Sequence, residues 1–301
     1  EYGPGVYVGE GTGLFIPVGA ATEGIFIGTN EVTSLSLGNI PITEVYKGEY
    51  RIFPGPLPAG QQLFTTPGPD SWVCPAEVTS VSVVCIGGGG TNNDSTYDGG
   101  GGGAHTWRNN VAVTPGNTYN LLVGGAQGES NFTGDSVETR ARGGVGDAGG
   151  AVGPSDGDGG GRGGSGGLGF IDQSNAFGGG GGGAGGYSGA GGDGGTQGST
   201  TGGDGVGGGA GGGGNGAVFP GGDWPGGFGG GTGVDGEGAN GAGGSPTTGG
   251  GADGGDGSPG ANGTYGRGAR GSGVTETGGT GAVRIIWGPG RAFPSTNTGD
   301  V

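Results

Sequence analysis

The stretch Gly178–Gly198 reads GGGGGGAGGYSGAGGDGGTQG, and from Gly180 onward glycine occupies every third position in it. The same register returns in the stretches 157–169, 202–214, 227–236 and 251–266. A period of three fits neither the α-helix nor the β-strand, whose side chains repeat every 3.6 and 2.0 residues. It does fit the left-handed helix of the polyproline-II type, which has three residues per turn. The pattern therefore predicts rods of this kind.

The register breaks at bulky or turn-forming residues, which lie at 170–177, 200–201, 217–225 and 245–248. A flexible linker needs no register, and a collagen-like helix needs more proline and no resets. Because a lone polyproline-II helix has no internal hydrogen bonds, its backbone groups need partners on neighbouring rods. We therefore expect an ordered bundle of about six rods over 143–281, with disorder or a β-solenoid as the alternatives. Gly189 and Gly208 would face inward in the middle of a rod, where a Cβ would hold neighbouring rods apart.

Acidic residues dominate the charge, with 26 Asp and Glu against 10 Lys and Arg and a formal net charge of −16. Such a surface does not suit nucleic acid or an anionic membrane, which both attract cationic surfaces. Only 29% of the residues are apolar, too few for one conventional core in a chain of 301 residues. No apolar stretch reaches the length of a bilayer span and no signal peptide is visible, so we expect no membrane insertion. The chain contains no Met, and we expect its natural start to lie before Glu1.

Short apolar stretches predict strands on both sides of the glycine-rich stretch. They lie at 6–8, 14–18, 24–27, 32–37, 42–46, 50–53, 62–66, 71–74, 78–86, 104–113, 119–123 and 281–287. The last of these is far from its expected partners, which indicates an insertion. The predicted fold is mainly β, with a large insertion that is neither α nor β. It comprises a small N-terminal β module (1–56), a β-sandwich-like domain (57–142 plus 279–301) and an inserted bundle of polyglycine-II helices (143–278).

The sequence offers no constellation of catalytic or metal-binding residues, so we expect no enzyme, no metal site and no cofactor. The single histidine, His105, has no Ser or Cys partner at a recognisable spacing and fits a strand instead. Aspartates among the glycines, such as Asp193 and Asp253, do not reproduce the calcium-binding nonapeptide and are expected to be solvated on the rod surface. Cys74 and Cys85 are expected to be buried free thiols, with a Cys74–Cys85 disulfide as the alternative.

The β segments resemble a glycine-rich domain that is common in structural proteins of tailed phages. The similar stretches are Leu63–Thr65, Trp72–Pro75, Val78–Gly90, Gly103–Trp107, Val113–Gly124 and Gly281–Gly288. Upstream, Val32–Pro54 looks like a small β repeat that often precedes this domain in virion proteins. The tail, Trp287–Pro294, is similar to those of cyanophage-type tail proteins. The rods resemble, in architecture rather than in alignable sequence, the polyglycine-II receptor-binding tip of long-tail-fibre adhesins of T-even-like phages.

This resemblance implies a virion component of the tail fibre or tail tip that is assembled in the host cytoplasm and binds a host cell surface. A purely structural tail or capsid decoration protein is the alternative, and an ice-binding surface is a third class. The implied partners are other virion proteins, held through the N-terminal module, and a host glycan or outer-membrane protein. A trimer, or attachment to a trimeric fibre, is left open. Binding is expected at the turns, because rigid rods with variable turns place recognition loops on a stiff scaffold.

Six rods of alternating direction that leave and re-enter the sandwich at one end would put the turns near 152–156, 200–202 and 245–250 at the far end. The receptor-binding candidates there are Ser155, Asp156, Thr200, Thr201, Pro246, Thr247 and Thr248. The aromatic turns 170–177 and 219–228 would then lie against the sandwich and clamp the bundle to it, with receptor binding as their alternative role. Their aromatic residues are Phe170, Phe177, Phe219, Trp224 and Phe228. An odd number of rods would exchange the two sets of turns.

Overall fold

The computed structural model divides the chain into two compact units, Glu1–Pro58 and Ala59–Val301. It describes residues 59–172, 175–196, 201–214, 224–247, 250–258 and 265–301, together with the backbone of six short strands in the first unit. Every regular element of this described part is a strand. The chain is therefore mainly β, as the sequence predicts.

The first unit contains three antiparallel pairs of short strands among its described residues. They are β1 (Phe26–Ile27) with β2 (Asn30–Glu31), β3 (Leu35–Leu37) with β4 (Ile40–Ile42), and β5 (Val45–Lys47) with β6 (Tyr50–Phe53). Each range predicted between 24 and 53 overlaps one of these strands. The strands predicted at 6–8 and 14–18 lie outside the described residues.

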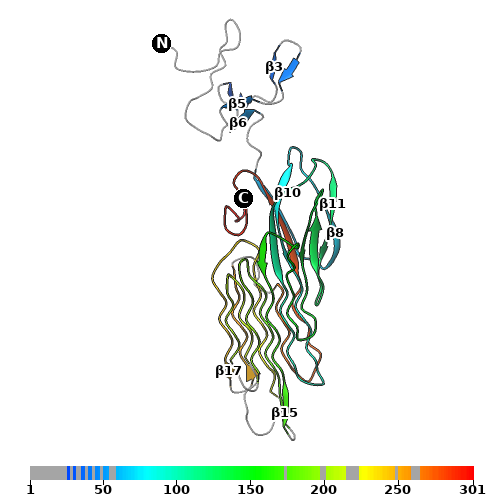
Figure 1. Cartoon of the computed structure of the whole chain (residues 1–301), viewed down its shortest axis with the longest axis vertical. Helices are drawn as coiled ribbons and strands as arrows, with labels where there is room; N and C mark the ends of the chain where they lie inside the picture. Colours follow the sequence, from blue (N-terminus) through cyan, green and yellow to red (C-terminus); the bar gives the residue numbers. More distant parts are fainter. Residues whose placement is uncertain are drawn as a thin grey trace. The chain divides into compact units, whose positions relative to one another are not determined.

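Two antiparallel sheets form one end of the second unit (Figure 1). In spatial order, the five-stranded sheet consists of β14 (Gly159–Gly161), β10 (His105–Ala112), β9 (Ser80–Ile86), β19 (Ala282–Trp287) and β7 (Gly60–Phe64). The four-stranded sheet consists of β13 (Glu138–Ala141), β12 (Ser130–Thr133), β11 (Thr118–Val123) and β8 (Gly68–Val73). Strand β19 lies between β9 and β7, where Ile285 is paired with Val83 and Gln62. The predicted return of the last strand to its distant partners is thereby confirmed.

Apolar side chains fill the space between the two sheets, as the alternation in 78–83 predicts. The five-stranded sheet contributes buried residues such as Val83 and Ile285, and the facing sheet contributes Trp72 and Phe132. The Trp72 ring lies 6.1 Å from that of Phe132 and 5.7 Å from that of Trp287, measured between ring centroids. We call this the inner core.

The other face of the five-stranded sheet is also buried, which explains why almost every residue of β19 is apolar. Its side chains Val84, Ile86, Ala282 and Ile286 pack against Tyr187, Val234, Tyr265 and Phe293, which come from glycine-rich turns and the C-terminal tail. Trp107 packs against this cluster and donates its indole N–H to the carbonyl of Tyr187 at 2.8 Å. We call this the outer core. It joins the sheet to the rest of the unit.

Extended glycine-rich segments make up the remainder of the second unit and run side by side away from the sheets and back (Figure 1). We call residues 87–104 and 143–281 the glycine-rich region. Its extended segments are 87–92, 99–104, 161–169, 177–186, 189–195, 202–206, 209–214, 224–233, 238–245, 251–257, 265–272 and 276–281. Among the described residues, ten of them follow residue 160, against the six rods expected. The stretch 180–198, which has one unbroken register, is divided by a turn at Tyr187 and Ser188.

Segment 177–186 shows how these segments are held together. Its N–H groups donate to three neighbouring segments in strict rotation, at donor–acceptor distances of 2.7–3.0 Å. The acceptors for Gly178 through Gly186, in order, are the carbonyls of Trp224, Tyr97, Gly195, Gly227, Gly100, Gly192, Gly230, Gly103 and Gly189. Its carbonyls accept from three more segments, 161–169, 209–214 and 265–272. The segment is thus surrounded by six others, and the pattern repeats every three residues.

Segments at the surface have fewer neighbours and carry the larger side chains. Arg162 and Leu168 on segment 161–169 are exposed, and Ser165 between them is half-buried, so every third residue faces solvent. The surrounded segments 177–186 and 209–214 contain only glycine and alanine after Phe177. A Cβ at Gly180 would overlap the carbonyl of Gly213 on the neighbouring segment. Backbone therefore fills the interior of this region.

Candidate binding surface

The turns between glycine-rich segments fall into two groups, at the sheet end and at the far end (Figure 1). At the far end lie the hairpin of β15 (Phe170–Asp172) and β16 (Asn175–Phe177) and that of β17 (Pro246–Thr247) and β18 (Gly250–Gly251). The turns 93–98 and 272–276 lie there too, since the Gly169 N–H donates to Asp98 and the Tyr97 ring contacts Gly273. The exposed residues of these turns form the candidate binding surface.

An aromatic cluster anchors the first of these hairpins. The rings of Phe170 and Phe177 stack with centroids 5.6 Å apart, and Phe177 is buried. Trp224 is bound through its backbone to both sides of Phe177, because it donates to the Ala176 carbonyl and accepts from the Gly178 N–H. Ile171 stays 55% exposed at the end of the hairpin. The hairpin thus presents an apolar side chain on a fixed base.

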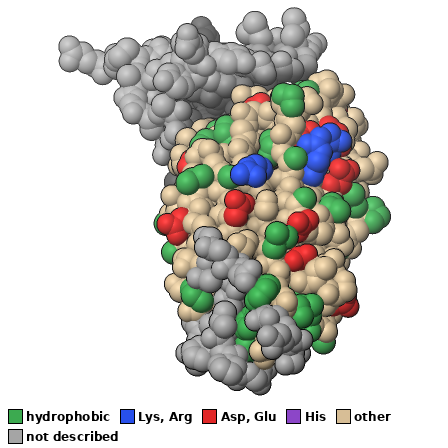
Figure 2. Space-filling model, turned by 60° about the horizontal axis from the view of Figure 1, so that its bottom comes forward, with side chains coloured by type: hydrophobic (Ala, Val, Ile, Leu, Met, Phe, Trp, Pro, Cys, Tyr) green, Lys and Arg blue, Asp and Glu red, His purple; other side chains and the backbone are tan. Residues whose placement is uncertain are grey.

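The turns 93–98 and 272–276 are fastened to each other by polar side chains. The Asn92 amide donates to the carbonyl of Val274 at 2.9 Å and accepts from the Glu276 N–H at 2.7 Å. The Thr275 hydroxyl donates to Asp94 at 3.1 Å. Val274 itself is 64% exposed. Figure 2 looks obliquely at the far end and shows hydrophobic side chains scattered over a surface that is mostly backbone and uncharged polar groups.

The expected placement of the aromatic turns is wrong. Phe170, Phe177 and Trp224 lie at the far end and do not clamp the bundle to the sheets. Phe228 lies on the side of segment 224–233, where its ring faces Arg267 and Arg270. The reason is that 143–158 forms no rod that reaches the far end. Within 143–281 the first full segment is 161–169, so its turn is the first one of this stretch at the far end.

The expected far-end position of Ser155 and Asp156 is also wrong, because arginines of the sandwich hold this turn at the sheet end. Asp156 is only 3% exposed and forms ion pairs with Arg140, at 3.1 Å, and Arg142. Burial acts to raise the pKa of Asp156, but the Gly153 N–H and the two guanidinium groups outweigh it and lower the pKa below its ordinary value.

The other predicted turn residues fall in two groups. Thr201 is exposed and Pro246 is half-buried, and both lie at the far end, as does the backbone of Thr247 in β17. Thr200, Thr248 and Phe219 lie outside the described residues. The structure therefore brings Thr201, Pro246 and Thr247 to the same end as the aromatic hairpin that was expected opposite them.

The residues that fasten the glycine-rich region to the sheet are different from those predicted. Tyr187 is fully buried, its ring lies 4.1 Å from that of His105, and its hydroxyl accepts the Gly236 N–H at 3.0 Å. Arg284 of β19, only 1% exposed, donates to the Val234 carbonyl at 3.1 Å and to Asp235 at 2.6 Å. The available signal was the interruption of the glycines by Tyr187-Ser188, which indicates a turn but not the end at which it lies.

His105 lies in β10 and is fully buried in the outer core. Neither ring nitrogen makes a hydrogen bond of normal geometry with the described residues. Burial lowers the pKa of His105 to about 3, and the nearby Gly233 backbone opposes the shift weakly. The imidazole is therefore neutral at physiological pH and occupies an apolar site.

Both cysteines are buried and free, with no disulfide between them. Burial raises the pKa of the Cys74 and Cys85 thiols, so neither is a reactive thiolate.

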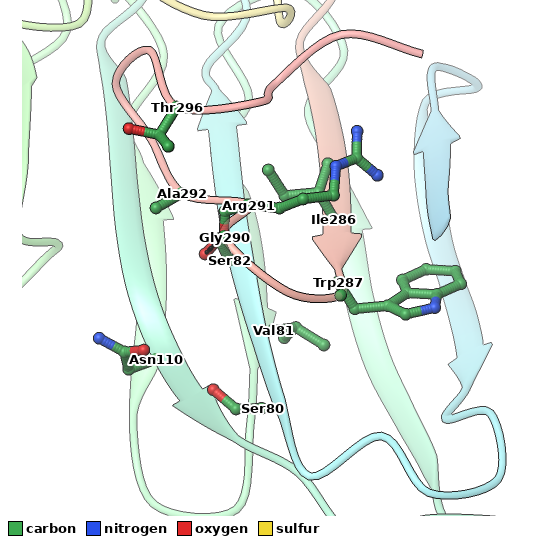
Figure 3. A pocket seen from close by; sticks show the side chains of 11 residues that line it. Ser80, Val81, Ser82, Asn110, Ile286, Trp287, Gly290, Arg291, Ala292 and Thr296 are labelled. Atoms are coloured by element: carbon green, nitrogen blue, oxygen red, sulfur yellow. Dashed lines mark hydrogen bonds between the residues drawn. The ribbon is translucent and has the colours of Figure 1, made fainter. Parts of the chain in front are cut away.

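Two hollows lie on the surface of the sandwich. The first, of about 350 Å³, lies between the sheet and the C-terminal tail and is lined by Ser80, Asn110 and Thr296 (Figure 3). The Arg291 guanidinium points away from Ser80 and Asn110 and donates to the carbonyls of Gly60 and Asn297. The second, of about 420 Å³, is lined by the ion-paired residues around Asp156. In the second hollow the Asp156 carboxylate is engaged by Arg140, Arg142 and the Gly153 N–H.

Acidic side chains of the glycine-rich region bond to backbone N–H groups at its edges. Asp193 accepts from Ser165 at 2.7 Å and Asp204 from Gly243 at 2.7 Å. Asp253 and Asp256 accept in the same way, at 2.8 Å, from Phe228 and Gly231. In the described residues no group of three or more His, Cys, Asp or Glu side chains could hold a metal ion. These carboxylates therefore complete the hydrogen bonding of segments that lack a neighbour.

The chain matches no protein-family model, and no curated protein is similar to it. None of the described residues belongs to a helix long and apolar enough to cross a bilayer.

Proposed function

We propose that this chain is a tail-fibre or tail-tip protein of a phage virion, in which a bundle of polyglycine-II helices presents its far-end turns to a host cell surface. The observation that carries the proposal is the collection of many short turns at one end of a rigid, backbone-bonded scaffold. Binding residues are disproportionately found on loops that such scaffolds position.

The hydrogen-bond rotation of segment 177–186 supports the polyglycine-II assignment. A strand bonds to neighbours on two sides, with alternating side chains, whereas a helix with three residues per turn points successive groups in three directions. The nine consecutive donors from Gly178 to Gly186 follow the threefold rule without exception. Amide hydrogen exchange tests it: we expect slow exchange in 178–186 and 209–214, and uniform fast exchange there would contradict the assignment.

The exposed groups at the far end favour recognition of a surface glycan or a loop of an outer-membrane protein. Ile171 and Val274 are 55% and 64% exposed at the far end, and the uncharged polar side chain of Thr201 is exposed at the same end. A rigid apolar contact in a polar rim is the usual arrangement of a binding hot spot. The first unit, Glu1–Pro58, would then attach the chain to other virion proteins.

A test replaces Ile171 and Val274 together by Ser in particles that carry the chain, and measures adsorption to the bacterium that they infect. We expect adsorption to fall at least tenfold, since two hot-spot contacts are removed. The matched control is Val206→Ser, because Val206 is 53% exposed beside the sheet-end turn at Gly207 and Gly208. Unchanged adsorption of the double variant would contradict the binding role.

A structural role in the virion is the second candidate, and the fastening of turns 93–98 and 272–276 to each other favours it. Under this alternative the region only stiffens or spaces the particle. Particles with the far-end substitutions would then adsorb normally, whereas deletion of the glycine-rich region would change particle assembly or length.

A further inference from the structure

A second cluster, half-buried, lies on the extended segments of the glycine-rich region, next to the far-end turn 272–276. Phe228 projects from segment 224–233, half-buried, and the guanidinium carbons of Arg267 and Arg270 lie 4.5 Å and 5.0 Å from its ring centroid. Backbone bonds join the two segments that carry these residues, from Gly226 to Gly271 at 2.9 Å and from Gly229 to Gly268 at 3.1 Å. The three side chains are therefore held on adjacent, mutually bonded segments.

The charges of this cluster are incompletely neutralised. Arg270 donates through Nε and Nη2 to Glu276 at 3.1 and 3.0 Å. Arg267 forms no ion pair with any described residue, although the chain has 26 acidic side chains against 10 basic ones. The carboxylate of Asp253, next to Phe228, accepts the N–H of Phe228 at 2.8 Å. An arginine without a carboxylate partner, held over an aromatic ring, is an open site for an anion.

We propose that this cluster binds a carboxylated sugar of an acidic polysaccharide. Arg267 would donate to the sugar carboxylate, and guanidinium groups bind carboxylates with paired hydrogen bonds. The edge of the Phe228 ring would pack on the sugar ring. Arg270 would donate to a hydroxyl or carboxylate of the next sugar, about 9 Å away, because three residues of a polyglycine-II helix rise by about 9 Å. The cation–π contacts hold both guanidinium groups in place before the ligand arrives.

A polysaccharide fits this cluster better than a protein partner does. One half-buried aromatic ring and two arginines make a small and polar contact, whereas stable protein interfaces bury well over 1,000 Å² around several apolar anchors. The net charge of −16 opposes an approaching polyanion only over about 8 Å at physiological salt, so contacts at short range decide binding. The site goes beyond the proposed function, because it uses none of the far-end turns.

The experiment measures binding of the full chain to polygalacturonate, with neutral dextran of similar size as the reference polymer. We expect polygalacturonate to bind, dextran not to bind, and Arg267→Gln to weaken the affinity for polygalacturonate about tenfold. The matched control is Arg162→Gln, since Arg162 is an exposed arginine of the same region with no ion pair to a described residue. It removes the same charge from another surface and should leave the affinity unchanged.

Three outcomes would overturn the proposal: equal binding of dextran, equal weakening by both arginine variants, or no binding of polygalacturonate at all. Sedimentation of the wild-type and Arg267→Gln chains measures whether the chain self-associates. A self-association that only the Arg267 variant loses would identify the cluster as a contact between copies and not as a sugar site. The Ile171 and Val274 variant should still bind polygalacturonate, so that loss of host adsorption and loss of this site are told apart.

Discussion

The two ends of the second unit fill their interiors in opposite ways. Between the sheets, large side chains such as Trp72 and Phe132 exclude water, and the backbone groups bond between neighbouring strands of each sheet. In the glycine-rich region the backbone itself occupies the interior, and segment 177–186 bonds to six neighbours through N–H and carbonyl groups. The difference shows that a chain with only 29% apolar residues is able to order a large unit if it removes side chains where segments must touch.

The stability of the sandwich should depend on the volume of its buried side chains. Trp72→Ala should lower the free energy of unfolding by about 3–5 kcal/mol, because it removes the ring that contacts Tyr119, Phe132 and Trp287. Chemical denaturation measures it. The control, Val73→Ala on the same strand, should change stability by less than about 0.5 kcal/mol, since Val73 is 60% exposed. Similar losses in both variants would mean that the inner core does not carry the stability of this end.

The glycine-rich region should be destabilised by added side-chain volume, whereas the sandwich is destabilised by its removal. Gly180→Ala should lower the free energy of unfolding by about 2–4 kcal/mol, because its Cβ would displace the Gly213 carbonyl and the hydrogen bonds around it. The control is Gly203→Ala at an exposed edge position, where the nearest atom to the new Cβ would be the Asp193 nitrogen at 3.2 Å. It should stay within about 0.5 kcal/mol of the wild type. An unchanged free energy of unfolding in Gly180→Ala would contradict the conclusion that backbone fills the interior of this region.

The predictions for Gly189 and Gly208 are corrected by the same geometry. Both lie at turns and not in the middle of a rod, and Gly208 has a φ of 73°. Substitution at Gly208 would therefore strain the backbone of a turn, whereas a Cβ at Gly189 would still overlap the Val206 carbonyl of the neighbouring segment.

The join between the two ends should be sensitive to acid. Because the folded-state pKa of His105 is lowered to about 3, the unfolded chain, with an ordinary histidine pKa near 6.5, takes up the proton first. Stability should fall as the pH drops below about 6.5, by about 2 kcal/mol at pH 5, in denaturation midpoints measured between pH 7 and pH 5. The Asp156 carboxylate adds its own loss only near and below its ordinary pKa of about 4. The stability of a His105→Gln variant should not change between pH 7 and pH 5. If its stability falls as steeply as that of the wild type, another titrating group causes the effect.

The smallest expected effect concerns the carboxylates at the edges. Asp193→Ala should cost about 0.5–1 kcal/mol, because the Ser165 N–H loses its acceptor at an exposed site. Asp193→Asn keeps an acceptor oxygen and should be nearly neutral. Denaturation of the two variants side by side measures the difference. Equal loss in both would show that charge, and not the hydrogen bond, is what matters at this position.

Much of the architecture follows from local sequence pattern. The alternation in 78–83 and the apolar run 282–287 predict strands, and their pairing is confirmed. Uninterrupted glycine, as in 178–183 and 211–214, marks the segments that the structure surrounds, and a larger residue at every third position, as at Arg162, Ser165 and Leu168, marks an exposed edge. These rules hold because a side chain is excluded wherever another backbone lies in contact.

Only the tertiary structure decides which end each turn occupies, and with it the composition of the candidate surface. That assignment depends on whether 143–158 makes a full segment, and it does not, because Arg140 and Arg142 hold Asp156 beside the sandwich and 159–161 adds to the edge of β10. The sequence alone determines that glycine-rich segments, turns and strands exist and in what order. Their placement rests on contacts between residues far apart in the chain, such as Tyr187 with His105 and Arg284 with Asp235, and no local pattern encodes those contacts.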